Sequence, residues 1–390
     1  MARGLTAERV RRDVEVVARA GLDIDTFLAE AAESVRRAVP WVGACLATVD
    51  PSTELLTGTR KFGDLQGRDS HDHEWALIEY GGTEPTTFTE MSRTGVAAAG
   101  VHATHGDPAS SLRMREFMEP HFGYGDELRI VFRDGQQAWG GAALFRDPGE
   151  APFDADEVAF AASLSGYFAA GVRTGLLARV ATATTLPAST GPTVLIIGRD
   201  DEVKQTSVGA EERLAELESP SHNARWTGII LSLVAAARRY ARGETTVPAR
   251  SRVRSRSGMW LVLHATPLLG PEGASGDVVV TVEEARPPAI VPLVVAAFDL
   301  TQRERDVTQL VLQGVDTKEI AAAMHVSAYT VQDHLKSVFD KADVRSRREL
   351  IARVYFDQYV PRMGSELGPS GWFTSVAPDA GSPASAQASR

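Results

Sequence analysis

The sequence predicts a multidomain protein in which two α+β units precede an all-α unit of four helices. The chain has 390 residues, enough for two or three domains at roughly 100–200 residues each. Apolar residues recur at strand and helix spacing in the first two units and only at helix spacing in the last. Segments rich in Pro, Gly, Ser and Ala separate them. We place the units at 1–180, 191–286 and 296–358, followed by a disordered tail at 364–390.

The boundaries come from three segments of linker composition. Ala181–Pro192 contains Ala, Thr, Ser and Pro without a charge, Ala285–Pro292 contains three prolines, and Gly364–Arg390 is rich in Gly, Pro, Ser and Ala. We expect each of the three to lie outside the folded units.

The first unit is predicted to contain a helix around 27–39, a strand at Val42–Val49 and a hairpin that turns at Asp134-Gly135. A closing helix follows, with a capping-box pattern that begins at Asp154, and runs to about Leu177. This order of helices and strands indicates an α+β unit with an antiparallel sheet.

The second unit shows the same mixture of strands and helices. The expected strands are 194–197, 250–256, 259–266 and 277–283, and the expected helices are 210–217 and 228–240. Turns are predicted at 198–201, 257–258 and 270–276. The order of these elements again indicates an antiparallel sheet rather than alternating βαβ.

The third unit has four helix starts within about 55 residues. Each helix begins after a Ser, Thr or Asp that can cap it. Several of these caps are followed three residues later by Glu, which is the capping-box pattern. The caps are Thr301, Asp316, Ser327 and Ser346, and Gly314 ends the first helix. The short segment Met324–Ser327 between the second and third helices indicates the tight turn of a helix-turn-helix.

This segment closely resembles the LuxR-type, or GerE-type, helix-turn-helix family of transcriptional regulators. The matching residues are Leu300, Thr301, Arg303, Glu304, Gly314, Lys318–Ala321, Val326, Ser327, Thr330, Val331, His334, Leu335, Phe339, Lys341, Val344, Ser346, Arg347, Glu349 and Leu350. The resemblance implies sequence-specific binding of double-stranded DNA, with the third helix in the major groove.

The apolar side of that third helix determines which residues would face DNA. With Val331, Leu335 and Val338 inward, Gln332, Asp333 and Lys336 point outward. Gln can pair with adenine, Lys with guanine, and Asp can accept from the cytosine amino group, so we expect base contacts from these three. Phosphate contacts are expected from Lys318, Thr330, Lys341, Arg345, Ser346 and Arg347. An acid at Asp333 and Gln at 332 depart from the basic face usual in the family.

The first unit resembles a GAF domain in its order of helix, strands, hairpin and closing helix. Trp41–Cys45, Val49–Pro51, Asp126–Arg129 and Trp139-Gly140 are similar to actinobacterial regulators that join a GAF domain to a LuxR-type module. The second unit resembles a PAS domain. These resemblances imply a sensory region that modulates DNA binding, either through a small-molecule pocket or as a dimerisation surface. We expect a homodimer, and RNA polymerase and an unidentified small molecule stay open as further partners.

Composition limits the alternatives. The net charge of −10 argues against a protein that coats nucleic acid along its whole surface, but allows a local binding face. A single cysteine excludes an intrachain disulfide and fits a reducing compartment. No signal-peptide pattern follows the charged N-terminus, and the longest apolar stretch, Ile290–Phe298, is about half of the roughly 20 residues that span a bilayer. We therefore expect a cytoplasmic protein without membrane contact.

Several polar residues leave two interpretations open. His71 and His73, with Asp69, Asp72 and Glu74, could bind a metal, but a polar loop is the simpler interpretation and no metal is predicted. His102 and His105 have the same two interpretations. Cys45 is expected to be a core thiol rather than a redox sensor. Three tryptophans could line a ligand pocket or pack in the core; they are Trp41, Trp75 and Trp139.

Arginines also crowd the segment 238–256. Those at 250, 252, 254 and 256 alternate and so share one face of a strand. They could bind an anion, a nucleic acid or the acidic first unit, but we expect a solvated sheet face. The segment Val194–Ile197 before Asp200 is similar to the start of a receiver domain, yet no later strand ends in a phosphoacceptor Asp. No enzyme motif is present, so neither catalysis nor a cofactor is predicted.

Overall fold

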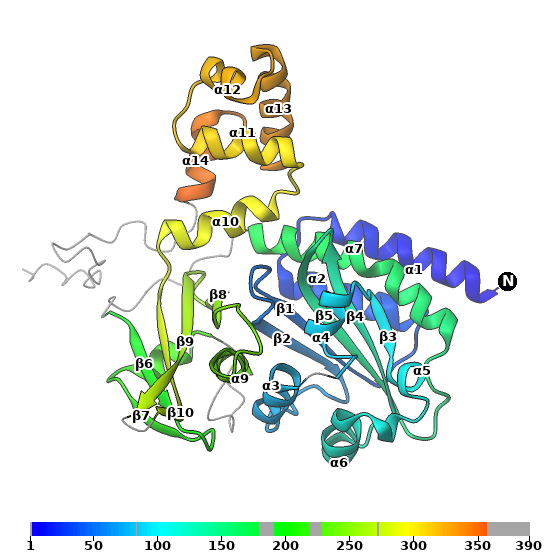
Figure 1. The fold of residues 1–390 in the computed structure, drawn as a ribbon. Helices are drawn as coiled ribbons and strands as arrows, with labels where there is room; N and C mark the ends of the chain where they lie inside the picture. Colours follow the sequence, from blue (N-terminus) through cyan, green and yellow to red (C-terminus); the bar gives the residue numbers. More distant parts are fainter. Residues whose placement is uncertain (1, 83, 179–190, 218–227, 271–272, 357–390) are drawn as a thin grey trace, which may run out of the picture.

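Two sheet-containing units and a helical module make up the computed structural model, which describes residues 2–82, 84–178, 191–217, 228–270 and 273–356 (Figure 1). The protein is therefore multidomain, with a sheet-rich N-terminal region and a helical C-terminal region, as the sequence predicts. The predicted tail and most of the first predicted linker lie outside the described residues. None of the described helices is both long enough and apolar enough to cross a membrane.

The first unit is built on a five-stranded antiparallel sheet with the order β2-β1-β5-β4-β3. Its strands are β1 Gly43–Val49, β2 Leu56–Gly63, β3 Ala98–Gly100, β4 Asp126–Asp134 and β5 Gln137–Arg146. The predicted strand at 42–49 and the predicted hairpin are confirmed, and Gly135 supplies the positive φ of 57° that the hairpin turn requires. Strand β2 was not predicted, because its residues are polar and only half-buried.

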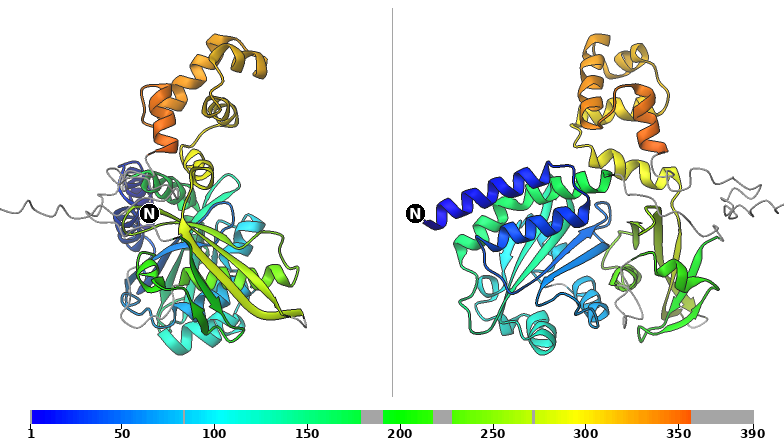
Figure 2. Two further views of the ribbon diagram at one scale, coloured as in Figure 1. Left: turned by 90° about the vertical axis from the view of Figure 1, so that its left-hand side faces the viewer. Right: turned by 180° about the vertical axis from the view of Figure 1, so that it is seen from behind.

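Helices cover both faces of this sheet (Figure 2). One face carries α1 Ala2–Ala18, α2 Ile24–Arg36 and α7 Ala155–Leu177; the other carries α3 Asp72–Gly81, α4 Phe88–Thr94, α5 Val101–His105, the helical turns Pro108–Ser110 and Met114–Met118, and α6 Glu119–Phe122. Along β4, Ile130 packs with the first group, whereas Val131 packs with Met91 of α4. The strand is consequently buried on both faces.

Of the two longest helices in the first group, the sequence predicts α7 but not α1. Helix α7 begins at the predicted capping box, where the Asp154 carboxylate accepts from the Glu157 amide at 2.8 Å. Helix α1 was not predicted, because it has a charged surface and only a narrow apolar stripe. That stripe, which includes Val10 and Val14, is fully buried against α2 and α7.

The second unit has its own five-stranded antiparallel sheet, in the order β7-β6-β10-β9-β8. Its elements are β6 Thr193–Ile197, β7 Val203–Thr206, α8 Ala210–Leu214, α9 Gly228–Ala241, β8 Arg250–Arg254, β9 Trp260–Gly270 and β10 Gly273–Glu284. The turn predicted at 270–276 is wrong in extent, because β9 and β10 stay paired as far as Gly270 and Gly273. Strand β7 was not predicted.

The two units meet through α9 and β8. Helix α9 packs against α3 and β2 of the first unit, and β8 lies beside β2. Arg252 on β8 is 5% exposed and donates through Nε to Asp50 at 2.7 Å; Asp50 is 1% exposed. The solvated strand face that the sequence favoured is therefore wrong at Arg252, which instead binds the acidic first unit. Burial opposes ionisation of Asp50, but the hydrogen bonds from Arg252 and Ser52 lower its pKa overall.

The linker predicted at 285–292 is also wrong from Pro287 onward. This segment forms α10, Pro287–Ala297, which lies between the sheets and the C-terminal module (Figure 1). Pro287 and Pro288 occupy the first turn, where a helix needs no amide donor, and only Pro292 interrupts its interior. Apolar Ile290 and Leu293 are buried against the core, so packing outweighs the local effect of the prolines.

The C-terminal module has the four helices that the sequence predicts. They are α11 Gln302–Leu312, α12 Thr317–Met324, α13 Ala328–Lys341 and α14 Arg347–Tyr355. Reciprocal capping boxes form at Thr301 and Asp316, and Gly314 follows α11 with a φ of +85°. The box predicted at Ser346 is incomplete: Ser346 accepts from the Glu349 amide, but the Glu349 carboxylate accepts from the amide of Arg345 instead.

Candidate nucleic-acid interface

Helices α12 and α13 form a helix-turn-helix at the end of the module that points away from the two sheets (Figure 1). Between them, His325 takes the left-handed conformation with φ 55°. The Val326 amide then donates to the Ala321 carbonyl at 3.0 Å, and Ser327 caps α13 by accepting from the Thr330 amide at 3.0 Å. These local bonds set the angle at which α13 leaves α12.

Helix α13 divides into a buried and an exposed face, as its sequence predicts. Val331, Leu335 and Val338 are buried against the other helices of the module. The three predicted base-contact residues are all exposed on the opposite face; they are Gln332, Asp333 and Lys336. The structure thus places these three on one accessible surface.

The residues predicted to contact phosphate fall into two groups. Lys318, near the start of α12, and Arg345, before α14, are exposed. The Thr330 hydroxyl lies 2.9 Å from that of Ser327, within the cap of α13. Lys341, Ser346 and Arg347 also have partners within the module.

Lys341 is held by a buried acid. Its Nζ donates to Glu304 at 2.7 Å, and the Ser337 hydroxyl donates to the same carboxylate at 2.6 Å. Glu304, which also caps Thr301 at the start of α11, is 5% exposed. Burial alone would raise its pKa, but the hydrogen bonds from Lys341, Ser337 and Thr301 lower the pKa of Glu304 to about 2. This contact joins α11 to α13 and neutralises one cation of the module.

Arg347 and Ser346 also bond within the module. The Arg347 guanidinium donates to the carbonyls of Val311, at 3.3 Å, and Val315. Ser346 caps α14. The family resemblance named both residues from their spacing, but the sequence does not indicate that Arg347 joins α14 to the end of α11 and the loop after it.

The end of α7 connects the two N-terminal units to this module. Arg353 of α14 donates to the Leu177 carbonyl at 3.0 Å, and Arg254 of β8 donates to the Ala178 carbonyl at 2.7 Å. Arg173 of α7 donates to Asp299 at 3.0 Å, just before α11. The last carbonyls of a helix have no partners within it, so arginines from two other units satisfy them here. Sequence reasoning missed this junction because its members lie far apart in the chain.

A small cavity lies beneath the face of the first sheet that α3, α4, α5 and α6 cover. Its volume of about 30 Å³ would hold about one water molecule. Trp75, Phe117, Phe145 and Cys45 line it. A much larger groove of about 1390 Å³ runs between the first unit, the second unit and α10. A molecule larger than water would fit the groove as it stands, but would enter the cavity only if side chains moved.

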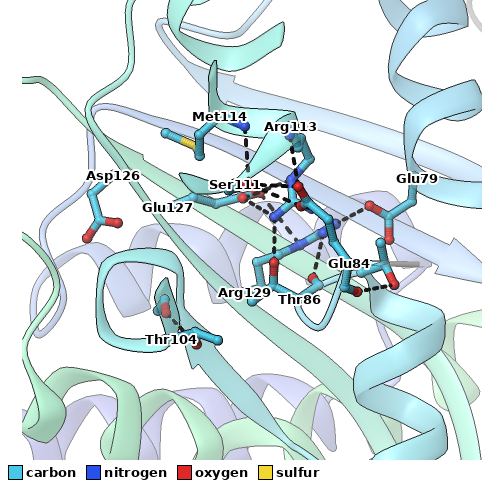
Figure 3. A network of polar contacts seen from close by, with 12 residues as sticks. Glu79, Glu84, Thr86, Thr104, Ser111, Arg113, Met114, Asp126, Glu127 and Arg129 are labelled. Atoms are coloured by element: carbon cyan, nitrogen blue, oxygen red, sulfur yellow. Dashed lines mark hydrogen bonds and ion pairs between the residues drawn. The ribbon is translucent and has the colours of Figure 1, made fainter. Parts of the chain in front are cut away.

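Buried ion pairs fix the segment that covers this face of the sheet (Figure 3). Arg113 donates to Glu127 at 2.6 Å and to Glu84 at 3.1 Å, and Arg129 donates to Glu79 at 2.8 Å. The side chains of both arginines, Glu79 and Glu127 are fully buried. Arg129 lies on β4, which helices cover on both faces, so its side chain is buried. The hydrogen bonds and ion pairs among these residues compensate for the cost of burying their charges.

Comparison with known proteins assigns the C-terminal module. Residues 299–354 match the model of "Bacterial regulatory proteins, luxR family". The spore germination protein GerE of Bacillus subtilis is 36% identical over 55 residues, which are 14% of this chain and 74% of GerE. A putative HTH-type transcriptional regulator of Aeromonas salmonicida is 49% identical over 51 residues, which are 13% of this chain and 26% of that protein.

The similarity to other proteins is confined to a part of each chain. This chain spans between 26% and 37% of the Aeromonas regulator and two further relatives. The solved Vibrio cholerae VqmA dimer, described as a LuxR-type receptor, is 18% identical over 45% of this chain and 89% of VqmA. Its TM-score of 0.20 is too low to bear on the arrangement of this chain.

The matched residues include all four caps of the module, the left-handed turn at His325 and the buried face of α13. With a family member that is 36% identical and covered over 74% of its length, the chain belongs to the luxR family of bacterial regulatory proteins, whose DNA-binding domain forms its C-terminal module.

Proposed function

We propose that the protein is a sequence-specific transcriptional regulator that reads DNA with α13 and whose N-terminal units modulate this binding. The observation that carries the proposal is the exposed face of α13 within a luxR-family module. Gln332, Asp333 and Lys336 lie there together, and no sheet or helix of the described N-terminal units covers them. Amide, carboxylate and ammonium groups can each pair with a base edge in the major groove.

We assign the phosphate contacts according to the exposure and the internal bonds of each side chain. Lys318 and Arg345 are exposed and can approach the DNA backbone directly. Thr330 lies at the start of α13, where helix amides favour an anion. Lys341, Ser346 and Arg347 would contact phosphate only by sharing or exchanging the internal partners described above. The basic residues of the module are offset by about as many acidic ones, so we expect modest non-specific affinity.

The sensory role rests on architecture. We assign GAF-like and PAS-like character to the first two units because each combines one antiparallel sheet with covering helices. The groove between these units borders α10 at Leu293, and the end of α7 bonds to α14. A ligand that favours one arrangement of the units would therefore change the position of the module. We propose that a homodimer reads a two-part site, so that this position sets the spacing of two α13 helices.

Selection from random DNA tests the central claim. The full chain and the segment 287–390 should each enrich one half-site at about 0.1 M salt, and the full chain should enrich a paired site. GerE, largely covered by the match, indicates that a protein can consist of little more than this module. Absence of sequence preference in both proteins would refute DNA reading, whereas a preference unchanged by any metabolite or cell extract would leave only constitutive dimerisation.

A further inference from the structure

A cluster of imidazoles and one carboxylate lies at the junction of α3 and α6. His71, just before α3, has Nδ1 3.0 Å from Glu74 Oε1. His121 of α6 approaches from the other side, with Nε2 3.3 Å from Glu74 Oε2. One potential ligand atom from each of the three residues lies within 4.8 Å of the others. The sequence placed His71 and Glu74 together, but only the fold adds His121.

These separations suit a metal ion. Ligand atoms that bind zinc at 2.0–2.2 Å in a tetrahedral arrangement lie roughly 3.3–3.5 Å apart. Both distances from Glu74 to the histidines are close to this range. His73 Nε2, 3.5 Å from Glu74 Oε1, offers a fourth donor from the same end of α3.

Aromatic packing holds the rings in place. The rings of His71 and His121 stack with centroids 4.0 Å apart, and both meet Phe117 edge-on. About a third of each imidazole side chain stays exposed, 32% for His71 and 30% for His121. An ion could therefore enter from solvent without unfolding this part of the unit.

The neighbouring acids determine the kind of ion. Asp69 and Asp72 belong to the same motif, but both pair with Lys61. The remaining donors are imidazole nitrogens and one carboxylate, a set that favours zinc and similar transition metals over calcium or magnesium.

We propose that His71, Glu74 and His121, with His73 as an additional donor, bind one divalent transition-metal ion such as Zn²⁺. The ion would join the start of α3 to α6, two segments that flank the small cavity through Trp75 and Phe122. Helix α3 also packs against α9 of the second unit. The site therefore lies where a bound ion would stiffen both the cavity wall and the contact between the units.

The test is a zinc titration of the tag-free, full-length protein after dialysis against a chelator, with a chromophoric chelator as competitor. Wild type should bind one Zn²⁺ per chain, and an excess of Mg²⁺ should not displace it. His121→Ala should weaken binding by roughly tenfold or more, since even residues that only support metal ligands have effects of this size. Glu74→Gln, which keeps the shape of the side chain, should do the same.

Matched substitutions make the result specific. His102→Ala, in the same unit but outside the cluster, and Asp69→Asn, in the motif but paired with Lys61, should leave zinc affinity unchanged. Circular dichroism of each variant checks that it is folded, and zinc-edge X-ray absorption should show at least two imidazole ligands. Failure of wild type to bind zinc, or zinc affinity in folded His121→Ala and Glu74→Gln that equals that of wild type, would overturn the proposal.

Discussion

The C-terminal module and the N-terminal sheet units of this protein are organised by different kinds of interaction. In the module, each helix begins at a side chain that caps it and each turn uses a residue suited to it, such as His325. In the sheet units, buried ion pairs join residues far apart in the chain, as Asp50 and Arg252 show. Local chemistry therefore identifies the DNA-binding module, whereas long-range contacts determine how the two sheet units are assembled.

The module has one exception to this rule, and it is informative. Glu304 caps its own helix and also receives Lys341 and Ser337 from α13. This single carboxylate combines the local and the long-range kind of contact. Four predictions test the comparison, from the largest expected effect to the smallest.

Loss of Arg113 should affect the sheet units most. In Arg113→Met, Glu127 stays fully buried without its closest cation, which should lower the free energy of unfolding by about 3–5 kcal/mol. Urea unfolding followed by tryptophan fluorescence measures this change. Arg115→Met, at an exposed position two residues later, should change it by less than about 0.5 kcal/mol. Equal effects of the two substitutions would show that the network contributes little.

The module should lose stability in acid through Glu304. Its pKa is about 2 in the folded state, against 4.5 normally, so the ionised form favours folding. The resulting stabilisation is complete above pH 4.5 and is lost as the pH falls toward 2. It is on the order of 3 kcal/mol. Urea unfolding of segment 287–390 at pH 6 and pH 3 should show more than half of this loss in wild type, because pH 3 still lies above the folded-state pKa. If Glu304→Gln loses as much stability on acidification, another group is responsible.

DNA binding should separate the two groups of exposed residues. Gln332→Ala or Lys336→Ala should lower affinity for the preferred site by about 1–3 kcal/mol and change the preferred bases. Lys318→Ala should weaken all sequences alike and reduce the salt slope by about one. Fluorescence anisotropy with matched and scrambled sites, at several salt concentrations, measures both effects. Identical behaviour of the two groups would contradict the assignment of base and phosphate contacts.

The junction between α7 and α14 should give the smallest effect. Arg353→Gln removes the hydrogen bond to the Leu177 carbonyl, which contributes about 1 kcal/mol. Amides at the end of α7 should then exchange with deuterated solvent about fivefold faster. Arg348→Gln, exposed on the same helix, is the control and should leave this exchange unchanged. Exchange that is equal in Arg353→Gln and wild type would mean that the Arg353 hydrogen bond does not stabilise the end of α7.

The sequence alone determined the parts of the protein that depend on neighbours in the chain. The four caps, the turn before α13 and the apolar stripe with Val331 specify the module and its exposed face, because each acts within about four residues. The hairpin at Gly135 and the capping box at Asp154 were predictable for the same reason.

Only the tertiary structure decided which partners the charged residues have. The alternation of arginines along β8 predicts a solvated face, yet Arg252 is buried, because the distant first unit covers it and binds it through Asp50. The prolines of α10 predict a linker, but the packing of Ile290 and Leu293 outweighs the local effect of these prolines. His121 likewise joins His71 and Glu74 only in the folded chain. Periodicity reports that a face is apolar or polar, but not what lies against it, and charge pairing across tens of residues leaves no local pattern.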